Sequence, residues 1–124
     1  MMNVSGKIVF ACGEVPEEIP NGSLLTVKVQ DTNRMDAPAV LLGEYKIIIQ
    51  SYNKGDLLTY EIKNASLPSY KRATLHAVLN IGWEASGNEW IRQGDYLNDT
   101  THPIEIEDDK SEYFGCDINV VHYI

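Results

Sequence analysis

"LLTVKVQD", residues 24–31, alternates apolar and polar side chains from its second position onward. The apolar residues are Leu25, Val27 and Val29, and the polar residues that follow each of them are Thr26, Lys28 and Gln30. Successive side chains of a β-strand point to opposite faces, so a period of two places each set on its own face. The stretch therefore predicts a strand with one face in a core and the other toward solvent.

The same period of two recurs in other apolar segments of the chain. It is present in "KIVFAC" (7–12), "LLTYEIK" (57–63) and "RATLHAVLNIGW" (72–83), whereas "AVLLGEYKIII" (39–49) is apolar on both faces near its ends. The remaining expected strands are "NEWIRQG" (88–94), "HPIEIE" (102–107) and "CDINVVHYI" (116–124). Turn-forming pieces such as "PNGS" and "NKGD" separate the segments. With no convincing helical period, the pattern predicts an all-β chain.

Short strands at regular spacing have to bury one face each, and a second sheet is the simplest cover. We therefore expect a single domain, residues 1–124, folded as an antiparallel β-sandwich of about seven to nine strands. Its architecture would be immunoglobulin-like without the immunoglobulin disulfide, because Cys12 and Cys116 lie too far apart in the sequence. These two residues are either ordinary buried thiols or one bridge between the terminal segments.

The formal net charge of −8 makes nucleic acids and anionic membrane surfaces unfavourable partners. We expect no membrane insertion, because no apolar run approaches the roughly 20 residues that a spanning helix needs. The opening "MMNVSGKIVF" lacks the basic and apolar regions of a signal peptide. The expected location is cytoplasmic if the chain is complete, and extracellular or periplasmic if a signal peptide was removed. N-x-S/T matches at Asn3, Asn21, Asn64 and Asn98 are glycosylation acceptors in a secreted chain and unmodified surface residues otherwise.

One run of segments can be read as a single module: "VSGKIVF" (4–10), "IPNGSLLTVKVQDTNRMDAPAVLLGEYKI" (19–47), "LLTYEI" (57–62) and "YKRATLHAVLNI" (70–81). Its distinctive residues are Gly6, Pro20, Gly22, Leu25, Val27, Val29, Asp31, Asp36, Ala37, Pro38, Ala39, Tyr60, Ala77 and Ile81. In this order the chain resembles the YbaY/YscW-type lipoprotein domain family. The resemblance covers a family-like core of roughly residues 4–106, and the part from Asp31 to Ala39 is the most specific.

The resemblance implies the fold of bacterial envelope lipoproteins and of type III secretion pilotin chaperones. The pilotin activity belongs to a subset of that family and depends on a secretin partner. This sequence departs from the family pattern because no lipobox cysteine follows a signal peptide. The hairpin from Trp83 to Tyr96 and an additional C-terminal strand, at about 113–124, are additions to the family core.

The polar stretch "QDTNRMDAPAV" (30–40) interrupts the alternation and is interpreted as a structural crossover loop. Asp31 ends a strand and can accept backbone hydrogen bonds, and Asp36 suits an Asx-type turn before Pro38, which fixes φ. The alternative is that Asp31, Arg34 and Asp36 form a paired-carboxylate or ion-binding site.

Metal and cofactor sites are not predicted. His76, His102 and His122 lie on separate segments without the spacing of a zinc site. The acidic run "EIEDDKSE" (105–112) lacks the spacing of a calcium-binding EF-hand loop and is interpreted as a solvated turn. Serine, cysteine and histidine never stand in a triad-like context, so no catalytic residue is proposed and the chain is expected not to be an enzyme.

Trp83, Trp90 and Tyr96 mark the long hairpin as a candidate surface for a protein partner, because aromatic residues dominate such contacts. The structural alternative places Trp83 in the core with Trp90 packed across from it as a cross-strand pair. The first functional hypothesis is accordingly a non-enzymatic protein-binding or chaperone-like module with an unknown partner. The second is a secreted, glycosylated interaction or protease-inhibitor domain that presents a proline-stiffened loop.

Overall fold

The computed structural model describes residues 1–10, 16, 18–33, 38–98 and 100–123. Their regular elements are, in chain order, β1 Met2–Phe10, β2 Ser23–Asp31, β3 Val40–Ile49, β4 Leu58–Ala65, the 3-10 turn Ser69–Lys71, β5 Arg72–Asn80, β6 Tyr96–Leu97, β7 His102–Glu105, β8 Glu112–Tyr113 and β9 Ile118–His122. Apart from that 3-10 turn, no helix is present in the described part of the chain.

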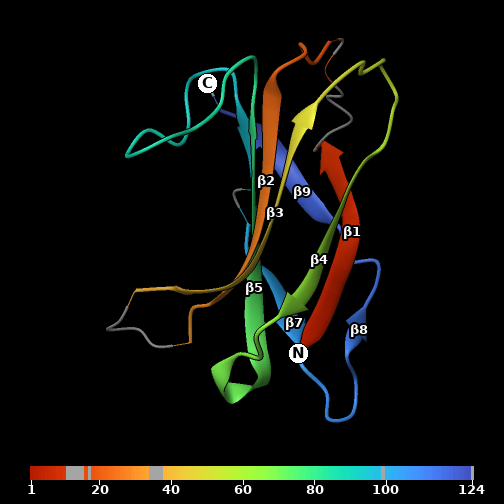
Figure 1. Cartoon of the computed structure of the whole chain (residues 1–124), viewed down its shortest axis with the longest axis vertical. Coiled ribbons are helices and arrows are strands. Elements are labelled where there is room, and N and C mark those ends of the chain that lie inside the picture. Colours follow the sequence, from red (N-terminus) through yellow and green to blue (C-terminus); the bar gives the residue numbers. More distant parts are fainter. Residues whose placement is uncertain (11–15, 17, 34–37, 99, 124) are drawn as a thin grey trace.

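The strands form one sheet in the order β3-β2-β5-β6-β9-β1-β4, with β7 beside β5 and β8 beside β1. This sheet curls into a half-barrel, so β2, β3 and β5 face β1, β4 and β9 across the interior (Figure 1). The prediction of an all-β, sandwich-like fold is confirmed. The sheet is mixed, because β1 pairs in parallel with β8 and β9 while its pairing with β4 is antiparallel.

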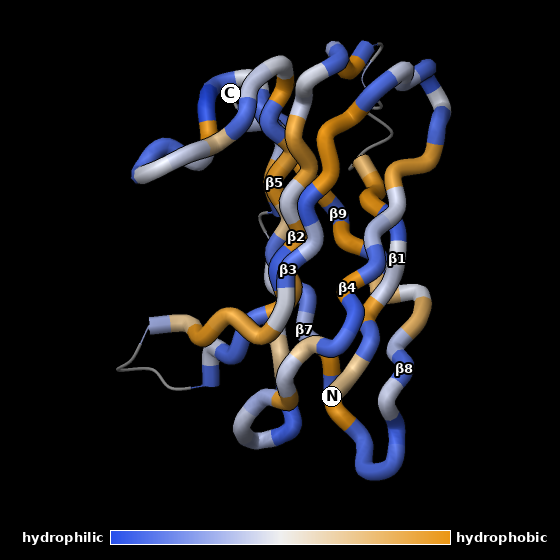
Figure 2. The backbone as a smooth tube through the Cα atoms, in the orientation of Figure 1, coloured by the Kyte–Doolittle hydropathy of each residue, from blue (hydrophilic) through white to orange (hydrophobic). Residues whose placement is uncertain are grey.

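The alternation seen in the sequence decides which side chains enter the core. Leu25, Val27 and Val29 of β2 are at most 1% exposed. The other strands contribute in the same way, with Ile8 and Phe10 from β1, Leu58, Tyr60 and Ile62 from β4, and Ala73, Leu75, Ala77 and Leu79 from β5. Figure 2 shows this pattern as hydrophobic and hydrophilic stretches that alternate along the strands.

The two free ends of the sheet, β3 and β4, approach each other at Gly43. A Cβ atom at this position would lie 2.7 Å from Cγ2 of Ile62 and 3.0 Å from Cβ of Ala65, so only glycine lets the strands come this close. Next to this point the backbone N–H of Ser66 donates to the carbonyl of Leu42 at 3.0 Å. The two edge strands of the half-barrel, β3 and β4, therefore touch each other near the start of β3.

The expected strand at 88–94 is wrong. The structure has only an isolated bridge between Ser86 and Glu89 there, and the next strand, β6, begins at Tyr96. The segment instead bends around the side chain of Asp95, which accepts the backbone N–H of Arg92 at 2.9 Å. A local carboxylate thus takes the place of a neighbouring strand as hydrogen-bond partner.

Candidate functional site

The outer face of β2 and β5, turned away from the core, carries the polar half of the alternation. Their antiparallel register places Lys28 opposite His76, and two residues along each strand it places Thr26 opposite Val78. Val78 and Leu24 also lie on this outer face, yet each is only 6% exposed. Another part of the chain therefore covers them.

The cover is the 83–96 hairpin, which folds back over β2 and β5. Between hairpin and sheet lies a hollow of about 390 Å³, here called the outer groove. Its lining comprises Leu24, Thr26, Lys28 and Gln30 of β2, Lys46 of β3, His76, Val78 and Asn80 of β5, and Ala85, Ser86, Gly87, Glu89 and Trp90 of the hairpin. The floor is apolar and the rim is polar, as in many ligand-binding sites.

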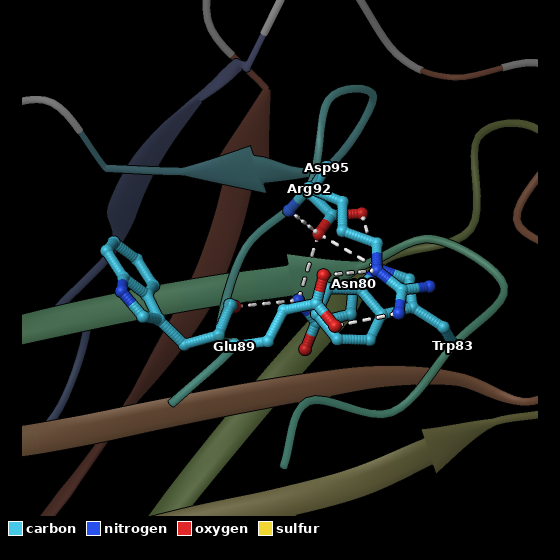
Figure 3. A network of polar contacts seen from close by, with 6 residues as sticks. Asn80, Trp83, Glu89, Arg92 and Asp95 are labelled. Carbon is cyan, nitrogen blue, oxygen red and sulfur yellow. Dashed lines mark hydrogen bonds and ion pairs between the residues drawn. The ribbon is translucent and has the colours of Figure 1, made fainter. Parts of the chain in front are cut away.

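The buried carboxylate of Asp95, 1% exposed, holds the hairpin in place (Figure 3). It accepts hydrogen bonds from the backbone N–H of Ile81 at 2.8 Å and from Nδ2 of Asn80 at 3.0 Å. Nε1 of Trp83 donates to both of its oxygens, at 3.0 and 3.1 Å, and the N–H of Arg92 donates at 2.9 Å. A charged group buried this deeply is tolerated because its acceptor capacity is used.

Backbone hydrogen bonds fix the base of the hairpin to Tyr123, the residue that follows β9. The N–H of Tyr123 donates to the carbonyl of Asp95, and the N–H of Gly94 donates to the carbonyl of Tyr123, both at 2.7 Å. On the other side, the N–H of Gly82 donates to Oγ of Ser23 at 2.8 Å. The hairpin is thus attached to both β2 and the C-terminal strand.

A second layer of contacts surrounds Trp83. The guanidinium of Arg92 lies 3.9 Å from the centre of the Trp83 ring, a cation–π geometry. The same guanidinium donates to both carboxylate oxygens of Glu89, at 2.8 and 2.9 Å. These hydrogen bonds lower the pKa of Glu89 and raise that of Arg92. Trp83 is only partly exposed, and its contacts with Asp95 and Arg92 stabilise the conformation of the hairpin.

Trp90 is the aromatic residue that the hairpin presents at the groove. Its side chain is 49% exposed and its ring centre lies 5.9 Å from that of His76. Nδ2 of Asn80 donates to its backbone carbonyl at 3.0 Å, which ties Trp90 to the Asp95 network. Trp90 is therefore held in position by backbone contacts while its indole remains available.

Positive charge gathers on the sheet side of the outer groove. Nζ of Lys28 and Nζ of Lys46 lie 4.0 and 3.8 Å from the carboxylate of Glu44, which stands beside them on β3. The pKa of His76 is lowered, first by burial of its ring and second by the charge of Lys28. Near neutral pH the imidazole is thus neutral, and the two ammonium groups carry the charge.

The three aromatic residues of the predicted partner surface do not share one surface in the structure. Trp83 and Trp90 both belong to the 83–96 hairpin, and Trp90 lines the outer groove. Tyr96 is 8% exposed and packs edge to face on Phe10, with ring centres 5.0 Å apart. On its other side it stacks on His122 at 4.8 Å. Tyr96 is therefore part of the core beneath the hairpin.

Asp31 lies at the other end of the sheet, in a group here called the crossover cluster: Asp31, Asn33, Ser69 and Arg72. Oδ1 of Asp31 accepts the backbone N–H of Asn33 at 3.0 Å, and Oδ2 accepts the N–H and hydroxyl of Ser69 at 2.8 and 2.6 Å. These hydrogen bonds, that of the Ser69 hydroxyl most of all, lower the pKa of Asp31 to about 2. Nδ2 of Asn33 in turn donates to the carbonyls of Ser69 and Arg72, both at 2.7 Å.

Three predicted residues, Arg34, Asp36 and Cys12, lie outside the described residues. Pro38 is described and exposed. Cys116 carries a free thiol that is half-buried, and burial raises its pKa.

The three histidines lie in different surroundings, as their separation in the sequence predicts. His76 lines the outer groove, whereas Nε2 of His102 accepts the N–H of Asn119 at 3.3 Å and His122 stacks on Tyr96. Within the described ranges, no group of three or more His, Cys, Asp or Glu side chains is placed to hold a metal ion. The acidic turn between β7 and β8 is exposed, and Asp108 pairs with Lys71 at 2.8 Å.

Sequence reasoning missed Asp95 and the position of Lys28, Lys46 and His76 in the outer groove. Alternation does place Lys28 and His76 on outward faces, but no sequence pattern shows that a hairpin covers them. Asp95 follows Gly94 and precedes a strand, which reads as an ordinary turn. Its four donors come from residues 80–92, so their convergence depends on the path of the hairpin.

In the described part of the chain no helix is long and apolar enough to cross a membrane. Scans against protein-family models and against curated proteins gave no match. Among solved structures, the chain is similar to an alternative pilotin from the type II secretion system of Vibrio cholerae. The TM-score is 0.63 at 13% sequence identity, over 98% of this chain and 96% of that chain. At this identity the likeness shows the fold alone, and the shared fold is that of a pilotin.

Proposed function

We propose that this chain is a non-enzymatic, chaperone-like protein-binding module and that its partner contacts the outer groove. One observation carries the proposal: Trp90 stands half exposed over an apolar floor, on a hairpin that a buried polar network holds in place. Aromatic side chains in such positions supply a large share of binding energy. Because the hairpin is already ordered, binding costs little conformational entropy.

The likeness to a pilotin supports the same class of function. That protein belongs to a secretion system, and its fold extends over nearly all of this chain. In this chain the 83–96 hairpin carries the exposed aromatic side chain of Trp90 at the outer groove. We therefore place the contact with the partner there rather than at the crossover cluster. Nothing in the described residues favours the alternative of a secreted inhibitor.

Photo-crosslinking in the native cells tests this proposal. A photoreactive phenylalanine analogue replaces Trp90 in one variant and Phe114, which is 75% exposed outside the outer groove, in a matched control. We expect a discrete protein adduct from position 90 and none of comparable yield from position 114. Equal yields from both positions, or no adduct from position 90 in the folded variant, would contradict the proposal.

A further inference from the structure

The charge of the outer groove points to the chemistry of its occupant. Lys28 and Lys46 share a single carboxylate, Glu44, at 4.0 and 3.8 Å. Both distances exceed those of a charge-assisted hydrogen bond, which are about 2.7–2.9 Å. Each ammonium group has three N–H donors, and neither donates to another described residue. Two cations with unused donors therefore stand at one rim.

The opposite rim does not neutralise this charge. Glu89 also lines the outer groove, but both of its carboxylate oxygens accept from Arg92. The rim formed by Lys28 and Lys46 thus carries an excess of positive charge, although the whole chain has a formal net charge of −8. A local field of opposite sign to the net charge selects ligands by their charge.

The floor adds a second requirement. Leu24 and Val78 lie at its base and are each 6% exposed, so the large apolar surface open to an occupant is that of Trp90 at the edge, which is 49% exposed. An occupant that leaves this surface in contact with water gains nothing from the hydrophobic effect. A long polyanion such as nucleic acid satisfies the lysines alone and is repelled by the rest of the chain.

We infer that the outer groove binds a segment of a partner protein in which an aspartate or glutamate stands beside large apolar side chains. The carboxylate accepts hydrogen bonds from Lys28 and Lys46, and the apolar side chains pack against Trp90, the exposed apolar side chain of the outer groove. This assignment rests on the proposed function and adds the chemistry of the partner to it. His76, whose ring lies beside Trp90, completes the wall between charged rim and apolar floor.

A random peptide library displayed on phage, selected on the full chain, tests the assignment. We expect the selected peptides to be enriched in Asp and Glu next to Leu, Ile, Val or Phe. One selected peptide, synthesised and measured by calorimetry, should lose affinity by about tenfold or more for the double variant Lys28→Glu with Lys46→Glu. Added salt should weaken the same peptide on the unsubstituted chain.

The matched control is Lys7→Glu with Lys63→Glu, which changes the net charge equally on β1 and β4, outside the outer groove. Its affinity should stay within about twofold of the unsubstituted chain, because the affected charges are distant and screened. Equal loss in both double variants, or selection of basic or uncharged peptides, would overturn the assignment. So would a failure to enrich any peptide, or self-association that depends on Lys28 and Lys46.

These outcomes separate the inference from the proposed function. Basic or uncharged peptides that still compete with the adduct at position 90 overturn the acidic specificity and leave protein binding at the outer groove intact. If the affinity of the selected peptides changes neither with Trp90→Ala nor with the double variant Lys28→Glu with Lys46→Glu, the inference and the proposed function are both overturned.

Discussion

The crossover cluster and the 83–96 hairpin are each organised by one aspartate, and the two aspartates differ mainly in burial. Asp31 is half-buried and accepts from Asn33 and Ser69, whereas Asp95 is 1% exposed and accepts from four different residues. The first fixes a turn that joins strands. The second fixes a surface that we assign to a partner. A carboxylate can therefore serve the fold or the function, and its surroundings decide which.

The turn between Ser69 and Arg72 of the crossover cluster has strained backbone. Tyr70 and Lys71 both have φ of 55°, a left-handed conformation that costs non-glycine residues energy. The bonds from Ser69 to Asp31 and from Asn33 to the Ser69 and Arg72 carbonyls flank this turn on both sides. In the hairpin, the positive φ values fall on glycines such as Gly87 and Gly94. Of these two regions, the crossover cluster is the one that has to offset strain at non-glycine residues.

Removal of the buried carboxylate should have the largest effect. Asp95→Ala leaves the donors of Asn80, Trp83 and Arg92 without their acceptor in a buried site, and we expect a loss of about 3–4 kcal/mol in the free energy of unfolding. Equilibrium urea unfolding measures this loss. Asp95→Asn, which keeps the shape and part of the acceptor capacity, should lose less. If the free energy of unfolding of Asp95→Ala lay within about 1 kcal/mol of that of wild type, the hairpin would not be organised by Asp95 and the comparison with Asp31 would fail.

The crossover cluster should respond to pH. The pKa of Asp31 is lowered from 3.8 to about 2 in the folded state, so its ionised form stabilises the fold above pH 3.8. This contribution is lost as the pH falls from 3.8 toward 2. We expect Asp31→Asn to unfold at a lower urea concentration than wild type at neutral pH, with an unchanged slope m.

The difference between these two proteins should shrink through the same acid window, because protonated aspartate resembles asparagine. Urea unfolding of both at a series of pH values tests this. A difference that stays constant down to pH 2 would show that Asp31 contributes through packing and not through its charge.

The rim of the hairpin should matter little for folding. Trp90 is 49% exposed, so Trp90→Ala is expected to lower the free energy of unfolding by less than about 1 kcal/mol. The same variant should lose its crosslinked or selected partner. A stability loss as large as that of Asp95→Ala would instead show that Trp90 is a structural residue, like Asp95, and not a binding residue.

The smallest expected effect is a shift in the pKa of His76. Lys28 lowers the pKa of His76, so Lys28→Gln should raise that pKa, although burial of the ring keeps it below its ordinary value. The titration of the His76 ring followed by NMR measures the shift. Lys63→Gln on β4 serves as the control and should leave the titration unchanged. A fall in the pKa of His76 in the first variant would contradict the charge arrangement of the outer groove.

Strand content and core followed from the sequence because alternation is a local property. Leu25, Val27 and Val29 are buried in the structure as their spacing predicts. Segment 88–94 was wrongly expected to be a strand because a local carboxylate, and not a neighbouring strand, satisfies its backbone. The outer groove depends on where the hairpin lies over Val78, which is a contact between distant parts of the chain. Tyr96, which the sequence predicts on the partner surface, is buried because distant residues, Phe10 and His122, pack on its two sides.

The pairing of β1 has a consequence for how the chain folds. Met2–Phe10 pairs in parallel with β8 and β9, and the bond from the N–H of Lys7 to Asp117 spans 110 residues. During synthesis β1 leaves the ribosome long before these partners exist, whereas β2 and β3 can pair as soon as both have emerged. Long loop closure slows folding. Strand β1 therefore stays unpaired on one side until β8 and β9 have been synthesised, and an unpaired strand edge of this kind is open to aggregation.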